Sequence, residues 1–243
     1  RLRIKRKSTH RLVGGVQLPR VGAGYTRMRP DRSWGTPCTI KLIQDVYAEF
    51  DSRNPGSVRG LIADISDEDG GWLPPHKSHQ RGVDIDVSYY KRNNTPMRGL
   101  EVVTPESIDI SKTWDLMRLF LNTGHIDMIF MDYRLQAVLY HYLRRQGYTE
   151  AQTSDWIQYP RSRRDRQGII RHSPGHHHHL HIRFDCVKTS DPCWRPATAL
   201  VPEAREKAQP RIVKSTDLKA TPVQAIPGPL PAQTIETRHT TAQ

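Results

Sequence analysis

The sequence predicts an α+β domain in which a small, mostly antiparallel central sheet is flanked by helices. Apolar residues recur at helical spacing in three segments, and four short segments have strand patterns. Long loops separate these segments without a regular β-α alternation, which favours α+β over a parallel α/β sheet. The chain has 243 residues, enough for one domain with a sizeable core. No apolar run approaches the ~18 residues of a membrane span, so we expect no transmembrane segment.

Three helices are predicted from spacing and end signals. The first begins with Thr36 as N-cap and Pro37 at the first helical position, and Asn54-Pro55-Gly56 stops it. The second begins at Ser111 and ends at Gly124, and the third ends at Gly147. We expect each helix to pack one apolar face against the sheet.

Four strands are predicted, at residues 61–65, 83–87, 126–131 and 179–184. Apolar and acidic residues alternate strictly in the second of these strands, so Asp84 and Asp86 share one face, which we expect to be open. The same alternation places His179, His181 and Arg183 together on one face of the last strand. Pairing of these two strands would bring carboxylates against imidazoles.

Charge divides the chain into three predicted parts. The formal net charge is +12, but residues 1–30 contain nine Lys and Arg and no acid, and residues 31–197 carry only +1. We predict a basic N-terminal arm over 1–11 and a folded domain over 12–197. Residues 198–243 contain six prolines and no aromatic residue, which predicts a disordered tail. The basic balance suggests an anionic partner, but the chain has no nucleic-acid-binding motif, so we expect no specific nucleic acid.

Seven of the twelve histidines lie in two short segments, one at residues 76–79 and one at 176–181. His79 precedes Asp86 by seven residues in a turn-rich stretch that can fold back over the strand. Two histidines and one carboxylate, with a fourth position left to water, are typical of a catalytic zinc site. Asp84 is either a partner that orients an imidazole or a solvated strand residue. A histidine-rich tract that only sequesters metal is the alternative for residues 176–178.

The segments Ser78-His79-Gln80-Arg81-Gly82-Val83-Asp84-Ile85-Asp86 and Gly175-His176-His177-His178-His179-Leu180-His181 resemble the penicillin-insensitive murein endopeptidases. These enzymes are grouped with lysostaphin-like peptidases, D-Ala-D-Ala peptidases and the hedgehog domain. The resemblance spans about residues 12–196. It implies one zinc ion per chain, with the ligands His79, Asp86 and His181. It also implies that His179 is catalytic and that His176 assists it. His76 would lie near the metal without ligating it, where it would contact either the substrate or a metal ligand.

The resemblance further implies hydrolysis of D-Ala to meso-diaminopimelate cross-links in peptidoglycan by a zinc-activated water. The alternatives are a carboxypeptidase or dipeptidase on the same fold and a non-catalytic, zinc-containing wall-binding domain. A peptidoglycan substrate places the protein in the periplasm of a Gram-negative envelope, where the basic arm could bind an anionic surface.

The three cysteines are Cys38, Cys186 and Cys193. Cys186 and Cys193 are close enough in sequence to close a small disulfide loop in an oxidising compartment, and three buried thiols are the alternative. With that disulfide formed, Cys38 would have no partner.

Overall fold

The computed structural model describes residues 11–186 and Val201, all within one compact unit, Arg1–Arg205. The predicted basic arm lies outside the described residues apart from Arg11. Of the predicted tail only Val201 is described: it is buried, and its backbone N–H donates to the Asn122 side chain over 2.8 Å. The three-part division of the chain therefore stays a prediction.

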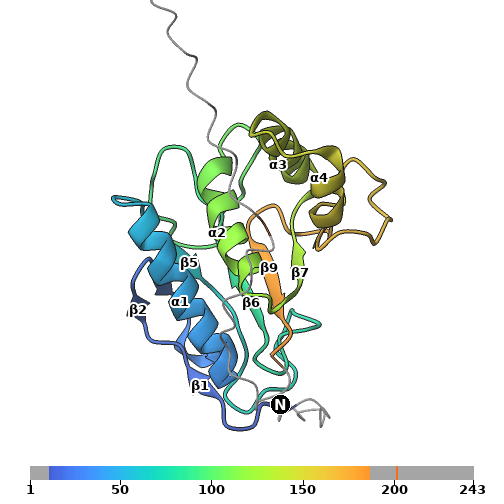
Figure 1. The fold of residues 1–243 in the computed structure, drawn as a ribbon. Helices are drawn as coiled ribbons and strands as arrows, with labels where there is room; N and C mark the ends of the chain where they lie inside the picture. Colours follow the sequence, from blue (N-terminus) through green and yellow to red (C-terminus); the bar gives the residue numbers. More distant parts are fainter. Residues whose placement is uncertain (1–10, 187–200, 202–243) are drawn as a thin grey trace, which may run out of the picture. The chain divides into compact units, whose positions relative to one another are not determined.

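A seven-stranded mixed sheet forms the centre of the described part of the chain, with β6 and β9 side by side within it (Figure 1). Its strands, in spatial order, are β2 (Val21–Gly22), β3 (Tyr25–Arg27), β5 (Gly60–Ile62), β6 (Asp84–Val87), β9 (Leu180–Phe184), β7 (Ile126–Phe130) and β8 (Ile170–Arg171). A separate antiparallel pair joins β1 (Val16–Gln17) to β4 (Trp34–Gly35). The α+β class is confirmed.

The central sheet has seven strands, more than the four predicted, and it is mixed because two of its six strand pairs are parallel. The pairs β3–β5 and β7–β8 are parallel, while β5–β6, β6–β9, β7–β9 and β2–β3 are antiparallel. Each parallel pair is joined by a helical crossover: α1 lies between β3 and β5 in sequence, and α3 and α4 lie between β7 and β8. A parallel pair needs such a crossover, because its second strand must start again at the same edge of the sheet. The parallel pairs are not readable in the sequence because β3 and β8 are only three and two residues long.

The three predicted helices are present and begin at side-chain caps. α1 (Pro37–Arg53) has Thr36 as its N-cap, whose side chain accepts from the Thr39 backbone N–H. α2 (Ile110–Asn122) is capped by Asp109 and α3 (Tyr133–Arg145) by Asp132. α1 and α2 pack side by side in front of the central strands (Figure 1). Their apolar faces join the buried core, which includes Tyr47, Phe50, Trp114 and Phe120.

A fourth helix, α4 (Glu150–Trp156), and a short 3₁₀ helix, Pro30–Arg32, were not predicted. α4 has a full capping box, in which the Thr149 hydroxyl accepts from the Gln152 N–H and the Gln152 side chain accepts from the Thr149 N–H. This Thr-x-x-Gln spacing is readable in the sequence. At seven residues, however, the helix is too short for its apolar periodicity to be recognised.

Gly82 sets the position at which the chain enters β6. Its φ is +69°, and a β-carbon there would lie 2.7 Å from the Gly35 α-carbon. The Gly82 carbonyl also accepts a hydrogen bond from the Thr36 N–H over 3.0 Å. The turn before β6 is thus locked against the start of α1 by a contact that only glycine allows.

Candidate metal centre

The register of β6 and β9 builds the centre of the site. Asp86 lies directly opposite His181, and Asp84 lies opposite Arg183. The sequence-based expectation that paired strands bring carboxylate to imidazole is therefore met. In the first of these pairs, Asp86 Oδ1 lies 3.0 Å from His181 Nδ1.

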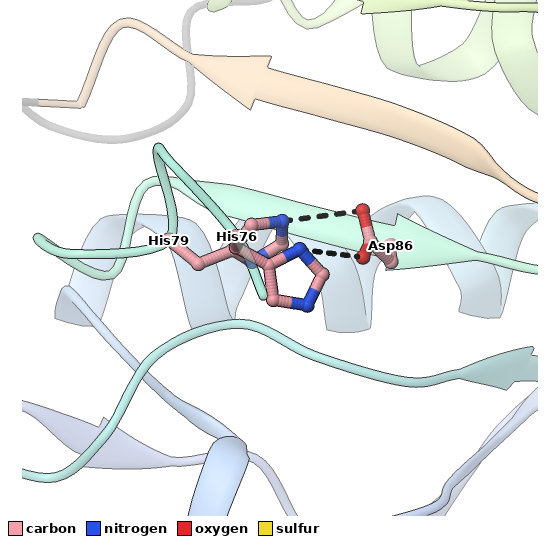
Figure 2. Close-up of side chains that lie close together, drawn as sticks. All are labelled: His76, His79 and Asp86. Carbon is pink, nitrogen blue, oxygen red and sulfur yellow. Dashed lines mark hydrogen bonds and ion pairs between the residues drawn. The ribbon is translucent and has the colours of Figure 1, made fainter. Parts of the chain in front are cut away.

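His76 and His79 reach the same carboxylate from the loop between β5 and β6. Figure 2 shows both imidazoles directed at Asp86. His79 Nε2 lies 3.2 Å from Asp86 Oδ1, and His76 Nδ1 lies 3.6 Å from Asp86 Oδ2. These three residues form a group that could hold a metal ion. Asp86 and His79 are fully buried, so the loop covers the face of β6 that was expected to be open.

A second, tighter triangle of potential ligand atoms includes His181. Its corners are His79 Nε2, Asp86 Oδ1 and His181 Nδ1, and its sides are 3.2, 3.0 and 3.1 Å. A tetrahedral metal with bonds of 2.0–2.1 Å to nitrogen and oxygen separates its ligand atoms by about 3.3 Å. The three protein atoms therefore lie within a few tenths of an ångström of the spacing that such a metal requires.

In both His79 and His181, the ring nitrogen that points away from Asp86 donates a hydrogen bond to an acceptor. The other ring nitrogen of each residue is therefore the one that could bind a metal. His79 Nδ1 donates to the Ile65 carbonyl over 2.9 Å, and His181 Nε2 donates to Asp84 Oδ1 over 3.0 Å. A metal ion bound beside Asp86 would take the place of the proton on each inward nitrogen, so both rings would then be neutral ligands. Metal-ligating histidines characteristically donate their other N–H to a carbonyl or carboxylate in this way. The donor set thus fits a metal by chemistry as well as by spacing, and Asp86 Oδ2 is buried without a hydrogen-bond partner among the described residues.

Asp84 is the partner of His181, and the alternative of a solvated strand residue is wrong. It is 3% exposed, and its Oδ1 accepts from both His181 Nε2 and Arg183 Nε, the latter over 2.8 Å. Burial alone would raise the pKa of Asp84, but His181 and Arg183 hold it below its usual value. Burial likewise opposes charge on His181, yet its hydrogen bonds to Asp84 and Asp86 raise its pKa to about 9.

His179 stands beside this triangle as a further buried imidazole. Its Nε2 lies 3.4 Å from Asp86 Oδ1, and the ring is 4.8 Å from that of His176. Burial lowers the pKa of His179 to about 3 and also lowers that of His176, so both imidazoles are neutral near pH 7. His178 belongs to the tract for which simple metal sequestration was the alternative. Its Nδ1 lies 2.6 Å from the Nδ1 of His179.

Asp64 is a residue of the site that sequence reasoning missed. Buried at the end of β5, it accepts from His76 Nε2 over 2.7 Å and from Arg32 over 3.1 Å, and Arg29 lies 3.4 Å away. The available signal was a single acid inside the apolar run Leu61-Ile62-Ala63-Asp64-Ile65. Asp64 therefore anchors His76 against Asp86.

The cysteine predictions have a mixed outcome. Cys193 lies outside the described residues, so the Cys186–Cys193 disulfide stays a prediction. Cys38 and Cys186 are both buried, and their sulfur atoms lie 2.6 Å apart. Cys38 therefore has the Cys186 sulfur as its close neighbour, and the expectation tied to the Cys186–Cys193 disulfide stays untested.

The fold and the site together define an α+β domain whose central strands and covering loop present a buried group of histidines and a carboxylate that could hold a metal ion. The family model of the penicillin-insensitive murein endopeptidases matches residues 4–135, and the chain belongs to this family. The matched segment includes His76, His79 and Asp86 and ends before β9.

Two curated relatives are similar over a longer stretch. Penicillin-insensitive murein endopeptidases of Haemophilus influenzae and Yersinia enterocolitica are 25% and 24% identical to the chain, over 76% and 75% of its length. The chain spans 64% and 65% of the length of these relatives. Among the described residues, no helix is long and apolar enough to cross a membrane.

Proposed function

We propose that this protein is a zinc-dependent endopeptidase that hydrolyses peptide cross-links in peptidoglycan. The observation that carries the proposal is the triangle formed by His79, Asp86 and His181, with the neutral imidazole of His179 beside it. Membership in the murein endopeptidase family supports the substrate class.

His79 Nε2, Asp86 Oδ1 and His181 Nδ1 would hold the metal. Two nitrogens and one carboxylate oxygen are the donor set of many catalytic zinc sites, which keep a fourth position for water or substrate. A zinc ion there would supply Lewis acidity, which activates water as a nucleophile and polarises the scissile carbonyl. Asp84 and the Ile65 carbonyl keep both imidazoles in the ligating tautomer.

His179 is the candidate for proton transfer. Its neutral ring can accept a proton from the attacking water and deliver it to the leaving amine. His176 lies 4.8 Å away between ring centres, and its Nδ1–H donates to the Ser173 carbonyl over 3.0 Å. Its Nε2 would help to orient the substrate as an acceptor, and it would donate to the developing oxyanion once protonated. His76 is held by Asp64 at the free oxygen of Asp86, on the metal side of the site.

The cross-link between D-Ala and meso-diaminopimelate is the proposed bond, which places the protein in a Gram-negative periplasm. A stem-peptide carboxypeptidase or dipeptidase would cut terminal residues instead, and a non-catalytic wall-binding domain would cut nothing. Digestion of purified sacculi, with the fragments identified by mass spectrometry, separates these activities. The proposal expects cross-linked muropeptides to become monomers with their stem peptides intact. Trimmed stem peptides with the cross-links retained would contradict it.

Two single variants test the assigned roles. His181→Ala removes a ligand, so we expect both bound zinc and sacculus hydrolysis to be lost. His179→Ala leaves the three ligands in place, so we expect about one zinc per chain by elemental analysis and a fall in kcat of at least ~100-fold. Hydrolysis at the parental rate by metal-free protein would contradict the mechanism. Loss of zinc in His179→Ala would instead make His179 a ligand.

A further inference from the structure

A strongly basic surface with partly exposed tyrosines lies outside the candidate metal centre, on α3 and on the loop between α4 and β8. The loop contains three exposed arginines within four residues, and within the part of the chain that the structure describes none of them has an ion-pair partner. Its one acid, Asp165, lies 3.7 Å from Arg161. We call this region the arginine–tyrosine surface; it consists of Tyr133, Tyr140, Tyr159, Arg163, Arg164 and Arg166.

The tyrosines form a connected row of partly exposed rings. Tyr159 lies 5.2 Å from Tyr133 and 5.4 Å from Tyr140 between ring centroids, and the Arg163 guanidinium carbon is 5.1 Å from the Tyr133 centroid. The Tyr133 hydroxyl donates to the Arg161 carbonyl over 2.7 Å. This bond ties the loop to the start of α3, so the arginines are presented on a fixed support.

The surface adjoins the metal centre through the first residues of α3. The backbone N–H of Asp132 donates to the His176 carbonyl over 3.1 Å, and the N–H of Tyr133 donates to His172 Nδ1 over 3.2 Å. The Tyr133 and His172 rings are 6.1 Å apart. The start of α3 therefore contacts both the histidine segment of the site and the row of tyrosines.

The chemistry of the surface suits a polymer that carries both carboxylates and sugar rings. Guanidinium groups pair with carboxylates through two parallel hydrogen bonds. Tyrosine rings present apolar faces with a polar edge, which suits the apolar faces of pyranose rings. Resting on the function proposed above, we propose that the arginine–tyrosine surface holds the peptidoglycan strand beyond the cross-link being cut. It would supply affinity for the intact polymer and leave the chemical step unchanged.

The test compares two substrates with the zinc-loaded protein. The triple variant Arg163→Glu, Arg164→Glu, Arg166→Glu is expected to bind sacculi at least about tenfold more weakly in co-sedimentation at moderate salt. It should also digest sacculi more slowly, while its kcat on a soluble cross-linked muropeptide dimer stays at the parental value. Tyr140→Ala, which changes no charge, is expected to weaken sacculus binding several-fold.

The matched control reverses three exposed arginines elsewhere, Arg20→Glu, Arg59→Glu and Arg98→Glu, with the same change in net charge. It should bind sacculi like the parent at moderate salt, because long-range charge effects are screened there. Equal binding by the triple variant and the control would overturn the proposal. So would a loss of dimer cleavage in a triple variant that still folds, because the arginines would then serve the metal centre itself.

The remaining outcomes separate this proposal from the proposed function. If the parent cuts neither substrate but binds sacculi through these arginines, the binding surface stands and the endopeptidase assignment fails. If the triple variant loses binding to double-stranded DNA but keeps parental sacculus binding, the surface is a nucleic-acid site and the proposal is wrong.

Discussion

His181 shows how the site depends on single atoms, because its two ring nitrogens face two different carboxylates. Nε2 donates to Asp84, and Nδ1 faces Asp86 and His79. Arg183 binds the same Asp84 oxygen and keeps that carboxylate charged. Replacement of Asp84 would therefore change the metal centre without removing a ligand.

Asp84→Asn tests this role. An amide can present its nitrogen where the carboxylate presented an acceptor, so the His181 tautomer is no longer fixed, and we expect zinc affinity to fall about 10–100-fold. Competition with a chromogenic chelator measures the affinity. Asp155→Asn, an exposed acid on α4, is the control and should bind zinc like the parent. Unchanged affinity in Asp84→Asn would contradict the role.

At the scale of the elements, turns and helix ends place the ligands. β6 must start at a fixed point, because a one-residue shift would turn Asp86 away from His181. The contact of Gly82 with Gly35 fixes this start, as does the hydrogen bond between the Gly82 carbonyl and Thr36.

Gly82→Ala should therefore be costly. An alanine would have to adopt a positive φ, and its β-carbon would collide with backbone that cannot move aside. We expect the free energy of unfolding to fall by about 1–3 kcal/mol in urea titrations. Gly147→Ala is a suitable control, since Gly147 also has a positive φ, +91°, but no atom lies within 4 Å of the added carbon. If the two variants lose equal stability, the collision at Gly82 contributes nothing.

The cap of α3 predicts a pH dependence. Burial alone would raise the pKa of Asp132, but its hydrogen bonds from Arg134 hold it below the usual value of 3.8. The charged form therefore stabilises the fold above pH 3.8, and this contribution is lost as the pH falls through the folded-state pKa.

Asp132→Asn keeps a capping oxygen but removes the charge. We expect it to be about 0.5–1 kcal/mol less stable than the parent near neutral pH. The difference should stay constant down to roughly pH 5 and shrink below the unfolded-state pKa. Urea unfolding at several pH values across this range measures the stability difference. A difference that grows on acidification would show that the charged form of Asp132 does not stabilise the fold.

At the scale of the whole molecule, the candidate metal centre joins segments far apart in the chain. His79, Asp86 and His181 come from the β5–β6 loop, β6 and β9, and β9 pairs with β7 on its other side. An ion held at this point would bind the native state and leave the unfolded chain largely unbound, so it would stabilise the fold by linkage.

Metal removal tests this coupling. At zinc concentrations near 1,000 times Kd, linkage contributes about 4 kcal/mol, so the chelator-treated protein should melt several degrees lower. Differential scanning calorimetry with and without chelator measures the shift. His181→Ala should show almost none. An equal shift in both proteins would indicate that the ion binds elsewhere.

Local patterns in the sequence determined where the main helices end and which faces of the strands carry the candidate ligands. Thr36-Pro37 and Asn54-Pro55-Gly56 marked the ends of α1, and the alternation of residues 83–87 and 179–184 placed Asp86 and His181 on matching faces. These features depend on neighbours along the chain, since caps and strand alternation are set within a few residues. One strand in each parallel pair, β3 and β8, lacked such a pattern because these strands are only three and two residues long.

Only the tertiary structure decided which groups surround those ligands. Asp84 was ambiguous in the sequence, because alternation gives a side chain its face but not what covers that face. The bond from Asp64 to His76 spans twelve residues, and the fold brings β9 against β6 across almost a hundred. The burial of these side chains, the tautomers of the histidines and the pKa shifts all follow from contacts between distant segments. Such contacts cannot be read from the neighbouring residues in the sequence.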